Sequence, residues 1–257
     1  MRWYAEMGVD EMVGASPSDM TQWAAEEKTA LSAPAPAKKN GQAAIQTPPS
    51  KSGPPAADEA IQAAERAAAA ATNFAELEAA VRDFEGCGLK SGARNTVFAD
   101  GVAGAPLLVI GEAPGRDEDR IGRPFVGRAG ALLDRMLAAI EVSRETNALI
   151  SNVIYWRPPG NRTPTQTETM VCRPFVDQLI AITQPKAILL VGGAPLQALF
   201  GVTGIMRARG RWRELAAGGA TIPALPTFHP AYLLRQPAQK RLAWQDLQNL
   251  RDRLFAS

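Results

Sequence analysis

Short apolar runs along the chain alternate with longer segments whose apolar residues recur at helical spacing. The short runs, which are typical of buried strands, lie at residues 107–110, 149–155, 187–191 and 224–228. The longer segments predict helices at 57–71, 74–84, 128–142, 165–182 and 194–200, and a last amphipathic helix through Trp244, Leu247, Leu250 and Leu254. The helix at 74–84 also has a start signal, because Asn73 and Glu76 form the pattern of a capping box.

The order of these elements predicts an α/β fold. Strands that alternate with helices form parallel sheets, and helices cover both faces of such sheets. We therefore expect a three-layer α/β/α domain with a central, mainly parallel, four-stranded sheet. In such a sheet the ligand-binding crevice lies beyond the carboxyl ends of the strands.

Composition divides the chain into three parts. Residues 1–31 contain several aromatic and methionine side chains and are expected to form an N-terminal appendage with short helices. Residues 32–57 are rich in Pro, Ala, Gly and Lys, which is typical of a flexible linker. Residues 58–257 contain the alternating strands and helices and are expected to form the functional domain.

Charge and cysteine content narrow the class of protein. The chain has 257 residues, 46% hydrophobic content and a formal net charge of +2, so binding to a polyanion would depend on local basic clusters. Two cysteines and one histidine do not form a disulfide framework or a zinc site by themselves. The sequence has no apolar run of membrane-spanning length and no signal peptide, so we expect a cytoplasmic protein without membrane contact.

Polar motifs follow the predicted strands at their carboxyl ends. The first strand runs into GEAPG at 111–115, with Glu118 beyond it. Asn152 lies near the end of the second strand, and the single histidine, His229, follows the fourth. The first motif is not a Walker loop, because no Gly-Lys-Ser/Thr follows it, and its glycine spacing does not match a dinucleotide fingerprint. Taken singly, these features also fit a βα turn, a buried amide and a hydrogen-bonded histidine.

Together, however, the motifs resemble the uracil-DNA glycosylase superfamily, and in particular its iron–sulfur branch, often called family 4. The resemblance extends over roughly residues 84–257 and is carried by GEAPGRDEDRIGRPFVGRAGALLDRML, SNVIYWRPPGNRTP and HPAYLLRQP. It implies a uracil-DNA glycosylase-like fold. It also implies a monofunctional hydrolase that flips uracil out of DNA and breaks its N-glycosidic bond, which initiates base excision repair.

The resemblance implies roles for the residues of a base pocket. Glu112 would position the attacking water, and His229 would donate a hydrogen bond to uracil O2 as negative charge develops there. Asn152 would bind the polar edge of the base. The rest of the pocket would comprise the backbone at Ala113, Glu118 near C5 of the base, and Phe125 stacked on the ring.

The resemblance also implies a DNA-binding surface. Leu233, together with Leu234, would wedge into the duplex and fill the space that the flipped base leaves. Arg157, Arg162 and Arg235 would hold phosphates. A further basic element around Gly210, with Arg207, Arg209, Arg211 and Arg213, would be a solvated turn or, in this family, a backbone-binding loop.

The sequence departs from the iron–sulfur branch at the four positions of the cluster ligands. The resemblance places Phe84, Cys87, Trp156 and Cys172 there. Neither a phenyl ring nor an indole N–H can ligate iron. We therefore expect no 4Fe–4S cluster and no other cofactor or metal, with Phe84 and Trp156 filling the volume and the cysteines buried as small apolar residues.

Several functions stay open at this stage. The expected partner is uracil-containing DNA, single- or double-stranded, bound by a monomer at the bacterial nucleoid. A protein that binds uracil or abasic sites without turnover is an alternative, although it would need no water-positioning carboxylate such as Glu112. A glycosylase with a broader range of deaminated bases is another. A redox or metal protein is disfavoured because half of the cluster thiolates are missing.

Overall fold

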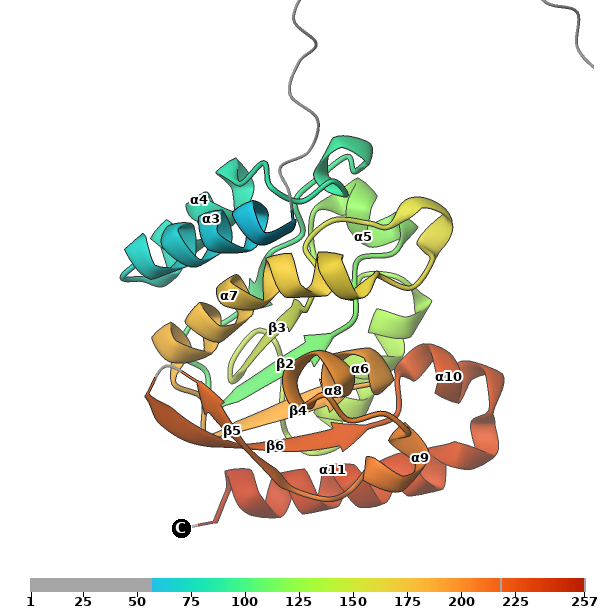
Figure 1. Ribbon diagram of the computed structural model, residues 1–257. Coiled ribbons are helices and arrows are strands. Elements are labelled where there is room, and N and C mark those ends of the chain that lie inside the picture. The colour runs from blue at the N-terminus through green and yellow to red at the C-terminus, as the bar shows by residue number, and fades with distance from the viewer. Residues whose placement is uncertain (1–56, 218, 257) are drawn as a thin grey trace, which may run out of the picture. The chain divides into compact units, whose positions relative to one another are not determined.

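The computed structural model describes residues 57–217 and 219–256 (Figure 1). Its centre is a six-stranded sheet in the order β1-β3-β2-β4-β6-β5. The strands are β1 Ala99–Gly101, β2 Leu107–Gly111, β3 Ala148–Asn152, β4 Ala187–Val191, β5 Arg213–Ala217 and β6 Ala220–Thr227. The expected appendage at 1–31 and almost all of the expected linker at 32–57 lie outside the described residues.

The four predicted strands form the parallel centre of this sheet, as β3, β2, β4 and β6. The prediction missed the two edge strands, β1 and β5, which pair antiparallel with β3 and β6. Both edge strands lack the apolar run that marks a buried strand. β1 has only three residues and includes Asp100, and β5 carries Arg213 and Glu214.

Helices cover both faces of the sheet and confirm the three-layer α/β/α architecture (Figure 1). On one face lie α3 Ala57–Ala70, α4 Phe74–Asp83, α7 Gln166–Thr183 and α8 Gly193–Phe200. On the other face lie α6 Arg128–Ala138 and α11 Lys240–Leu254. The short helices are α5 Arg116–Ile121, α9 Ile205–Ala208, α10 Pro230–Arg235, η1 Lys90–Gly92, η2 Pro159–Asn161 and η3 Pro237–Gln239.

The two faces of the sheet take alternate residues of each central strand, because successive side chains of a strand point to opposite sides. In β2, Leu108 and Ile110 pack under α7 and α8, whereas Leu107 and Val109 pack against α6 and α11. All of these side chains are buried. Continuous apolar strands are therefore what a sheet covered on both faces requires.

Local signals fix the helix ends near the site. Asn73 caps α4, as predicted, by accepting a hydrogen bond from the N–H of Glu76 at 3.0 Å; the Glu76 carboxylate accepts from the N–H of Thr72 rather than from that of Asn73, so the capping box is not complete. Helix α6 ends at Ala138, four residues before the predicted end at 142, and Glu141 follows in the left-handed conformation (φ 60°).

No helix within the described part of the chain is long and apolar enough to cross a bilayer.

Candidate active site

A cavity of about 560 Å³ lies beyond the carboxyl ends of β2, β3 and β6. It is the place where parallel α/β sheets bind ligands, next to the point at which the strand order reverses. Side chains from distant parts of the sequence meet in it, including Glu112, Phe125, Asn152, Arg162, His229 and Arg235. Of the predicted site residues, Ala113 and Glu118 line the same cavity, whereas Arg157, Leu233 and Leu234 do not.

Close packing at the end of β2 brings Phe125 and Asn152 together. A Cβ atom at Gly111 would come within 2.5 Å of both the Asn152 Oδ1 and the Phe125 Cζ atoms, so this position admits no side chain. Gly192, at the end of β4, has φ 106° and would press a Cβ against His229 at 3.3 Å. The glycines that end these strands therefore provide the space in which the site is built.

Phe125 forms one wall of the cavity in an uncommon backbone conformation. Its φ is 53°, in the left-handed region that a bulky residue adopts only when its surroundings impose it. Its ring is nearly buried and lies 5.8 Å from the imidazole of His229, centroid to centroid. The surroundings that hold this loop are two polar clusters, one on each side.

The first cluster is centred on Glu118. Its Oε1 accepts hydrogen bonds from the N–H groups of Val126 and Gly127, at 3.0 and 2.9 Å, and its Oε2 accepts one from Gly115 at 3.1 Å. Both carboxylate oxygens are thus bound to backbone amides. The predicted place of Glu118 near C5 of a base stays a prediction; its contacts tie the Gly115 turn to the loop after Phe125.

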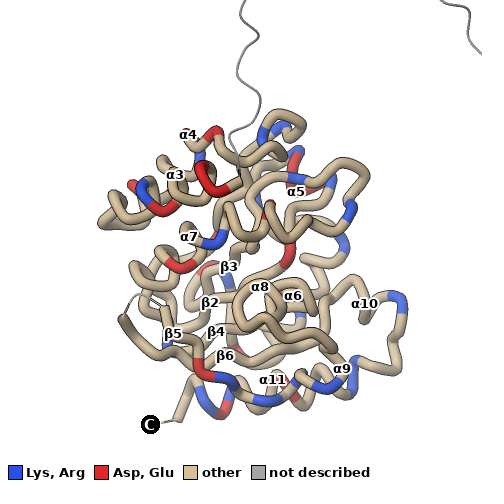
Figure 2. Tube along the Cα trace, viewed as in Figure 1, with Lys and Arg blue, Asp and Glu red and all other residues tan. Residues whose placement is uncertain are grey.

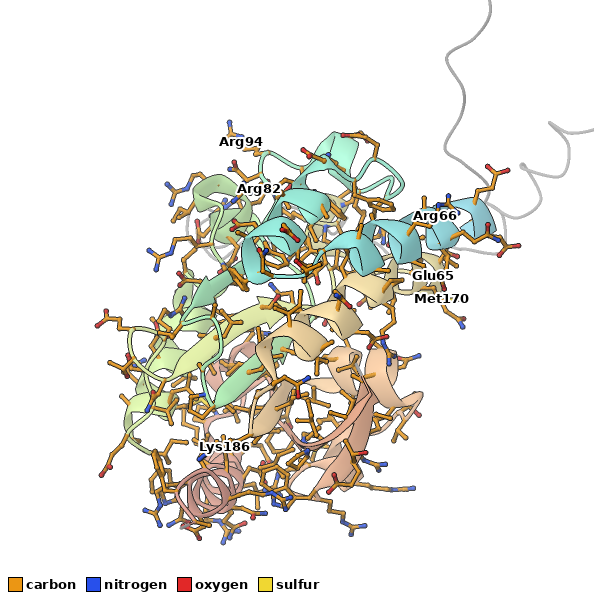
Figure 3. All side chains as sticks on the ribbon, turned by 90° about the vertical axis from the view of Figure 1, so that its left-hand side faces the viewer. Glu65, Arg66, Arg82, Arg94, Met170 and Lys186 are labelled. Carbon is orange, nitrogen blue, oxygen red and sulfur yellow. The ribbon has the colours of Figure 1, made fainter. Side chains whose placement is uncertain are left out.

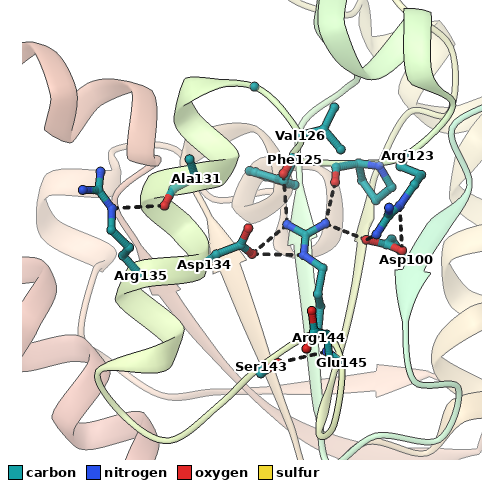
Figure 4. A network of polar contacts seen from close by, with 12 residues as sticks. Asp100, Arg123, Phe125, Val126, Ala131, Asp134, Arg135, Ser143, Arg144 and Glu145 are labelled. Carbon is teal, nitrogen blue, oxygen red and sulfur yellow. Dashed lines mark hydrogen bonds and ion pairs between the residues drawn. The ribbon is translucent and has the colours of Figure 1, made fainter.

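The second cluster is centred on Arg144, which the sequence analysis did not single out (Figure 4). Its guanidinium donates to the carbonyl oxygens of Pro124 and Phe125, both at 3.0 Å. It also pairs with Asp100 at 2.6 Å and with Asp134 at 2.8 Å. Burial raises the pKa of Asp100, but hydrogen bonds from Arg123 and Arg144 outweigh burial and hold that pKa below its ordinary value. No sequence signal marks these contacts, since they join segments far apart in the chain.

Asn152 presents an unpaired acceptor inside the protein. The residue is 2% exposed, and its Oδ1 has no hydrogen-bond partner among the described residues. A buried polar atom without a partner is costly, and in a native structure it calls for an explanation. Because Asn152 lines the cavity, a ligand with an N–H group at this place would supply the missing donor.

His229 is held in one protonation state and one tautomer. Burial, with a smaller effect of Arg235, lowers its pKa to about 4, so the ring is neutral at physiological pH. Its Nδ1 accepts a hydrogen bond from the N–H of Ala231 at 3.1 Å, where His229 caps helix α10. A neutral imidazole that accepts at Nδ1 carries its proton at Nε2. The residue therefore offers a neutral N–H donor at the cavity.

Glu112 lies in the cavity directly after β2. Burial raises the pKa of its carboxyl above the ordinary value of a glutamate. Its backbone oxygen is bound by the N–H of Ile154 at 3.1 Å, which fixes the main chain at this point. A carboxyl group with a raised pKa in a cleft is typical of functional sites.

Helix α10 differs from the prediction in which leucine it exposes. Leu233 is 1% exposed and packs with Leu132, Phe228 and Ala243, so its side chain belongs to the core in this structure. Leu234, one position further along the helix, is partly exposed. Arg235, at the end of α10, is exposed and borders the cavity.

The predicted phosphate-binding arginines differ in their surroundings. Arg162 makes a bidentate ion pair with Glu168, with distances of 2.9 and 2.6 Å, and stays partly exposed at the cavity. Arg157 donates to Asn161 Oδ1 at 2.6 Å and lies on the other side of the loop. In the basic element around Gly210, Arg209 is bound to the buried Asp246 and Arg213 stacks on Phe200, so only Arg207 and Arg211 are exposed.

The four predicted cluster positions are buried in one core. Phe84, Cys87, Trp156 and Cys172 are 7%, 3%, 1% and 0% exposed. The neighbouring thiol of Cys87, together with burial, raises the pKa of Cys172 well above its ordinary value.

Aromatic rings pack on one another in the same core as the two thiols. Phe84 packs on Phe175 with ring centroids 5.1 Å apart, and Tyr155 packs on both Phe175 and Trp156. Among residues 57–217 and 219–256, no group of three or more His, Cys, Asp and Glu side chains could hold a metal ion. Two thiols among aromatic rings do not fit a cluster that needs four thiolate ligands.

The fold and the cavity define an α/β protein with a candidate ligand site, lined by both polar and apolar groups, at the carboxyl edge of its sheet. The family model of the uracil DNA glycosylase superfamily matches residues 98–248, and the chain belongs to this superfamily. The type-4 uracil-DNA glycosylase of Pyrobaculum aerophilum is 34% identical over 177 residues, which are 67% of this chain and 90% of that protein. The type-4 enzyme of Thermotoga maritima is 37% identical over 174 residues, 65% of this chain and 88% of that protein.

Proposed function

We propose that this chain is a uracil-DNA glycosylase, a hydrolase that releases uracil from DNA and leaves an abasic site. The relatives that bear this name cover most of the chain. The observation that carries the proposal within the molecule is the unpaired Asn152 Oδ1, buried in a cavity that also contains the neutral N–H donor of His229. Uracil has the complementary pattern, since its N3–H lies between two carbonyl oxygens.

Base recognition follows from this pattern. The amide of Asn152 accepts from N3–H of the flipped uracil and donates to the adjacent carbonyl, and the ring of Phe125 stacks on the base. The backbone at Ala113 contributes to the same pocket. Extrusion of a base costs roughly a few kcal/mol, and these contacts offset part of that cost.

Departure of the base puts negative charge on the uracil ring and positive charge on the sugar. His229 Nε2–H donates to uracil O2 and stabilises the anion, and it does so as a neutral group because burial keeps its pKa at about 4. One preorganised donor of this kind is worth roughly 3–4 kcal/mol. Glu112 positions the water that attacks the sugar, and its carboxylate stabilises the positive charge beside it.

The duplex is opened from helix α10. Leu234, rather than the buried Leu233, is the apolar wedge, and Arg235 holds a phosphate next to the flipped nucleotide. Arg162 contributes its charge at the other rim of the cavity, where Glu168 keeps its guanidinium oriented. The substrate is uracil-containing DNA, single- or double-stranded, and the enzyme acts as a monomer in the cytoplasm, at the nucleoid.

We propose further that the enzyme works without an iron–sulfur cluster. Phe84, Trp156 and their aromatic neighbours pack the volume that a cluster would need, and only Cys87 and Cys172 could supply thiolates. Structural support for the loop before Pro158 then comes from apolar packing, and the reaction itself uses only water.

The test is excision from a panel of oligonucleotides that contain uracil, hypoxanthine, xanthine or thymine, in single- and double-stranded form, with a chelator present. The expected result is release of uracil, with strand cleavage only after alkali treatment, since no amine nucleophile lies among the lining residues. Release of the purines as well would favour the broader specificity. Tight binding to uracil-containing or abasic DNA without any release of base would favour a lesion-binding protein over a glycosylase.

A further inference from the structure

We refer to the 560 Å³ cavity beyond β2, β3 and β6 as the base pocket. Another cavity, of about 450 Å³, lies outside it. It is lined by Arg94, Arg116, Asp117, Asp119, Arg120 and Arg157, and we refer to it as the arginine pocket. Four guanidinium groups around one space repel one another unless an anion is present. None of the residues that line this pocket lines the base pocket.

The two carboxylates of the arginine pocket compensate at most half of this charge. Asp119 is 4% exposed, and its Oδ1 already accepts hydrogen bonds from the N–H groups of Arg94 and Asn95, at 2.8 and 3.2 Å. Asp117 pairs loosely with Arg120 at 3.9 Å, and both side chains are about half exposed. Within the described part of the chain, neither Arg94 nor Arg116 has a carboxylate partner. Both side chains are exposed and free to bind an anion.

The arginine pocket adjoins the base pocket along two stretches of chain. Gly115 and Pro158 line the base pocket, and Arg116 and Arg157, their immediate neighbours in sequence, line the arginine pocket. The two pockets thus share one ridge. Figure 2 shows basic positions near α5 and on the loop that precedes α7. Asn161 orients Arg157 by accepting from its Nε at 2.6 Å.

We propose that the arginine pocket binds a backbone phosphate of the DNA strand that carries the flipped nucleotide, at a position beyond the phosphates next to that nucleotide. Guanidinium groups bind phosphate oxygens in pairs, and phosphate contacts fix the register of a protein on DNA. In this proposal, the DNA strand whose uracil occupies the base pocket runs from that pocket over the shared ridge to the arginine pocket. This inference rests on the proposed glycosylase function, but the salt dependence of binding tests it separately.

The experiment compares the parent with the double variant Arg94→Ala, Arg116→Ala. Affinity for a long uracil-containing strand is measured over a range of salt concentrations. Each phosphate contact contributes roughly 0.7 to the slope of log K against log salt for a single strand and roughly 0.9 for a duplex. In the double variant the magnitude of this slope should decrease by the amount that one phosphate contact contributes. An unchanged slope would overturn the proposal.

A second readout uses the length of the substrate. The ratio of kcat/KM for a long strand to that for an oligonucleotide with only one nucleotide on each side of the uracil should fall in the double variant. The matched control is Arg66→Ala on α3, which is also exposed and lies far from Arg94 (Figure 3). The control should keep the parent's slope and ratio. An equal loss in the control would show a general charge effect and contradict a specific site.

The same variants separate DNA from a free anion. If the arginine pocket serves inorganic phosphate, titration with phosphate at constant ionic strength would raise the melting temperature of the parent but not of the double variant, while the salt slope would be the same in both. That outcome would overturn the assignment to DNA. If the parent bound DNA with the expected slope but released no uracil, the glycosylase proposal would fail and the arginine pocket would stand.

Discussion

Substitution of Arg144 by alanine tests whether the Phe125 wall depends on the polar network behind it. Arg144 lies on the loop after α6 and bridges two acidic residues and two backbone carbonyls (Figure 4). Its removal leaves the carbonyl oxygens of Pro124 and Phe125 without their donor. The left-handed backbone of Phe125 would then lose one of the two clusters that hold it, and only the Glu118 cluster would remain.

The expected magnitude follows from the burial of each partner. Arg144 and Asp100 are 11% and 16% exposed, so their pair is only partly buried, and loss of one partner costs at most the roughly 3–5 kcal/mol of a fully buried pair. Arg123 stays bonded to Asp100 and reduces this cost. The pair with Asp134, which is half exposed, adds at most about 1 kcal/mol. We expect Arg144→Ala to lower the free energy of unfolding by about 3 kcal/mol.

Two assays separate stability from positioning. Urea denaturation gives the free energy of unfolding, and single-turnover uracil excision, measured well below the melting temperature, gives the rate of the folded enzyme. Arg144→Ala should lower both, and Arg144→Lys should fall between Ala and the parent, since a lysine keeps the charge but not the forked geometry. The control Arg135→Ala removes an exposed arginine of α6 and should stay within about 0.5 kcal/mol of the parent. Parent-like stability and rate in Arg144→Ala would refute the reasoning.

Three further predictions concern the core, the pH profile and the wedge. Trp156→Ala should lower the free energy of unfolding by roughly 3–5 kcal/mol, with a smaller loss in Trp156→Phe. Parent protein prepared anaerobically should contain far less than one iron per chain, and stoichiometric iron would contradict the cluster-free core. The excision rate should show no inflection near pH 6.5, because the pKa of His229 is about 4. The rate should fall as the pH drops below the raised pKa of Glu112, and Glu112→Gln should abolish this fall. An inflection near pH 6.5 that His229→Gln removes would be contrary evidence. Leu234→Ala should impair excision from duplexes more than from single strands without loss of stability, whereas Leu233→Ala should destabilise the fold; the reverse pattern would restore Leu233 as the wedge.

The sequence predicted the parts of the fold that depend on continuous apolar patterns. The strand at 187–191 has the bounds of β4, because an unbroken apolar run is followed directly by two glycines. The strand expected at 224–228 is instead Ala220–Thr227, since Pro223 and Thr221 interrupt the apolar run and pairing with β5 extends the strand. Edge strands such as β1 and β5 are half exposed, and their polar residues conceal them from the pattern.

The candidate site was predictable where residues follow strand ends and unpredictable where tertiary contacts decide. Glu112, Asn152 and His229 lie in one cavity, as the carboxyl-edge rule and the resemblance led us to expect. Their catalytic roles stay predictions. The position of Leu233 depends on the rotation of α10 about its axis, which a six-residue helix does not reveal in sequence. Arg144 acts on residues about 20 and 44 positions away, and no local pattern records such contacts.

Release of free uracil by His229 variants tests the central claim most directly. Single-turnover excision from a uracil-containing strand, with a chelator present and with DNA affinity measured in parallel, compares the parent with His229→Ala. The parent should release uracil. His229→Ala should bind DNA as the parent does and react roughly two to three orders of magnitude more slowly, as expected for loss of one preorganised donor to the departing anion. A parent that releases no uracil, or a His229→Ala variant that reacts at the parent's rate, would contradict the account.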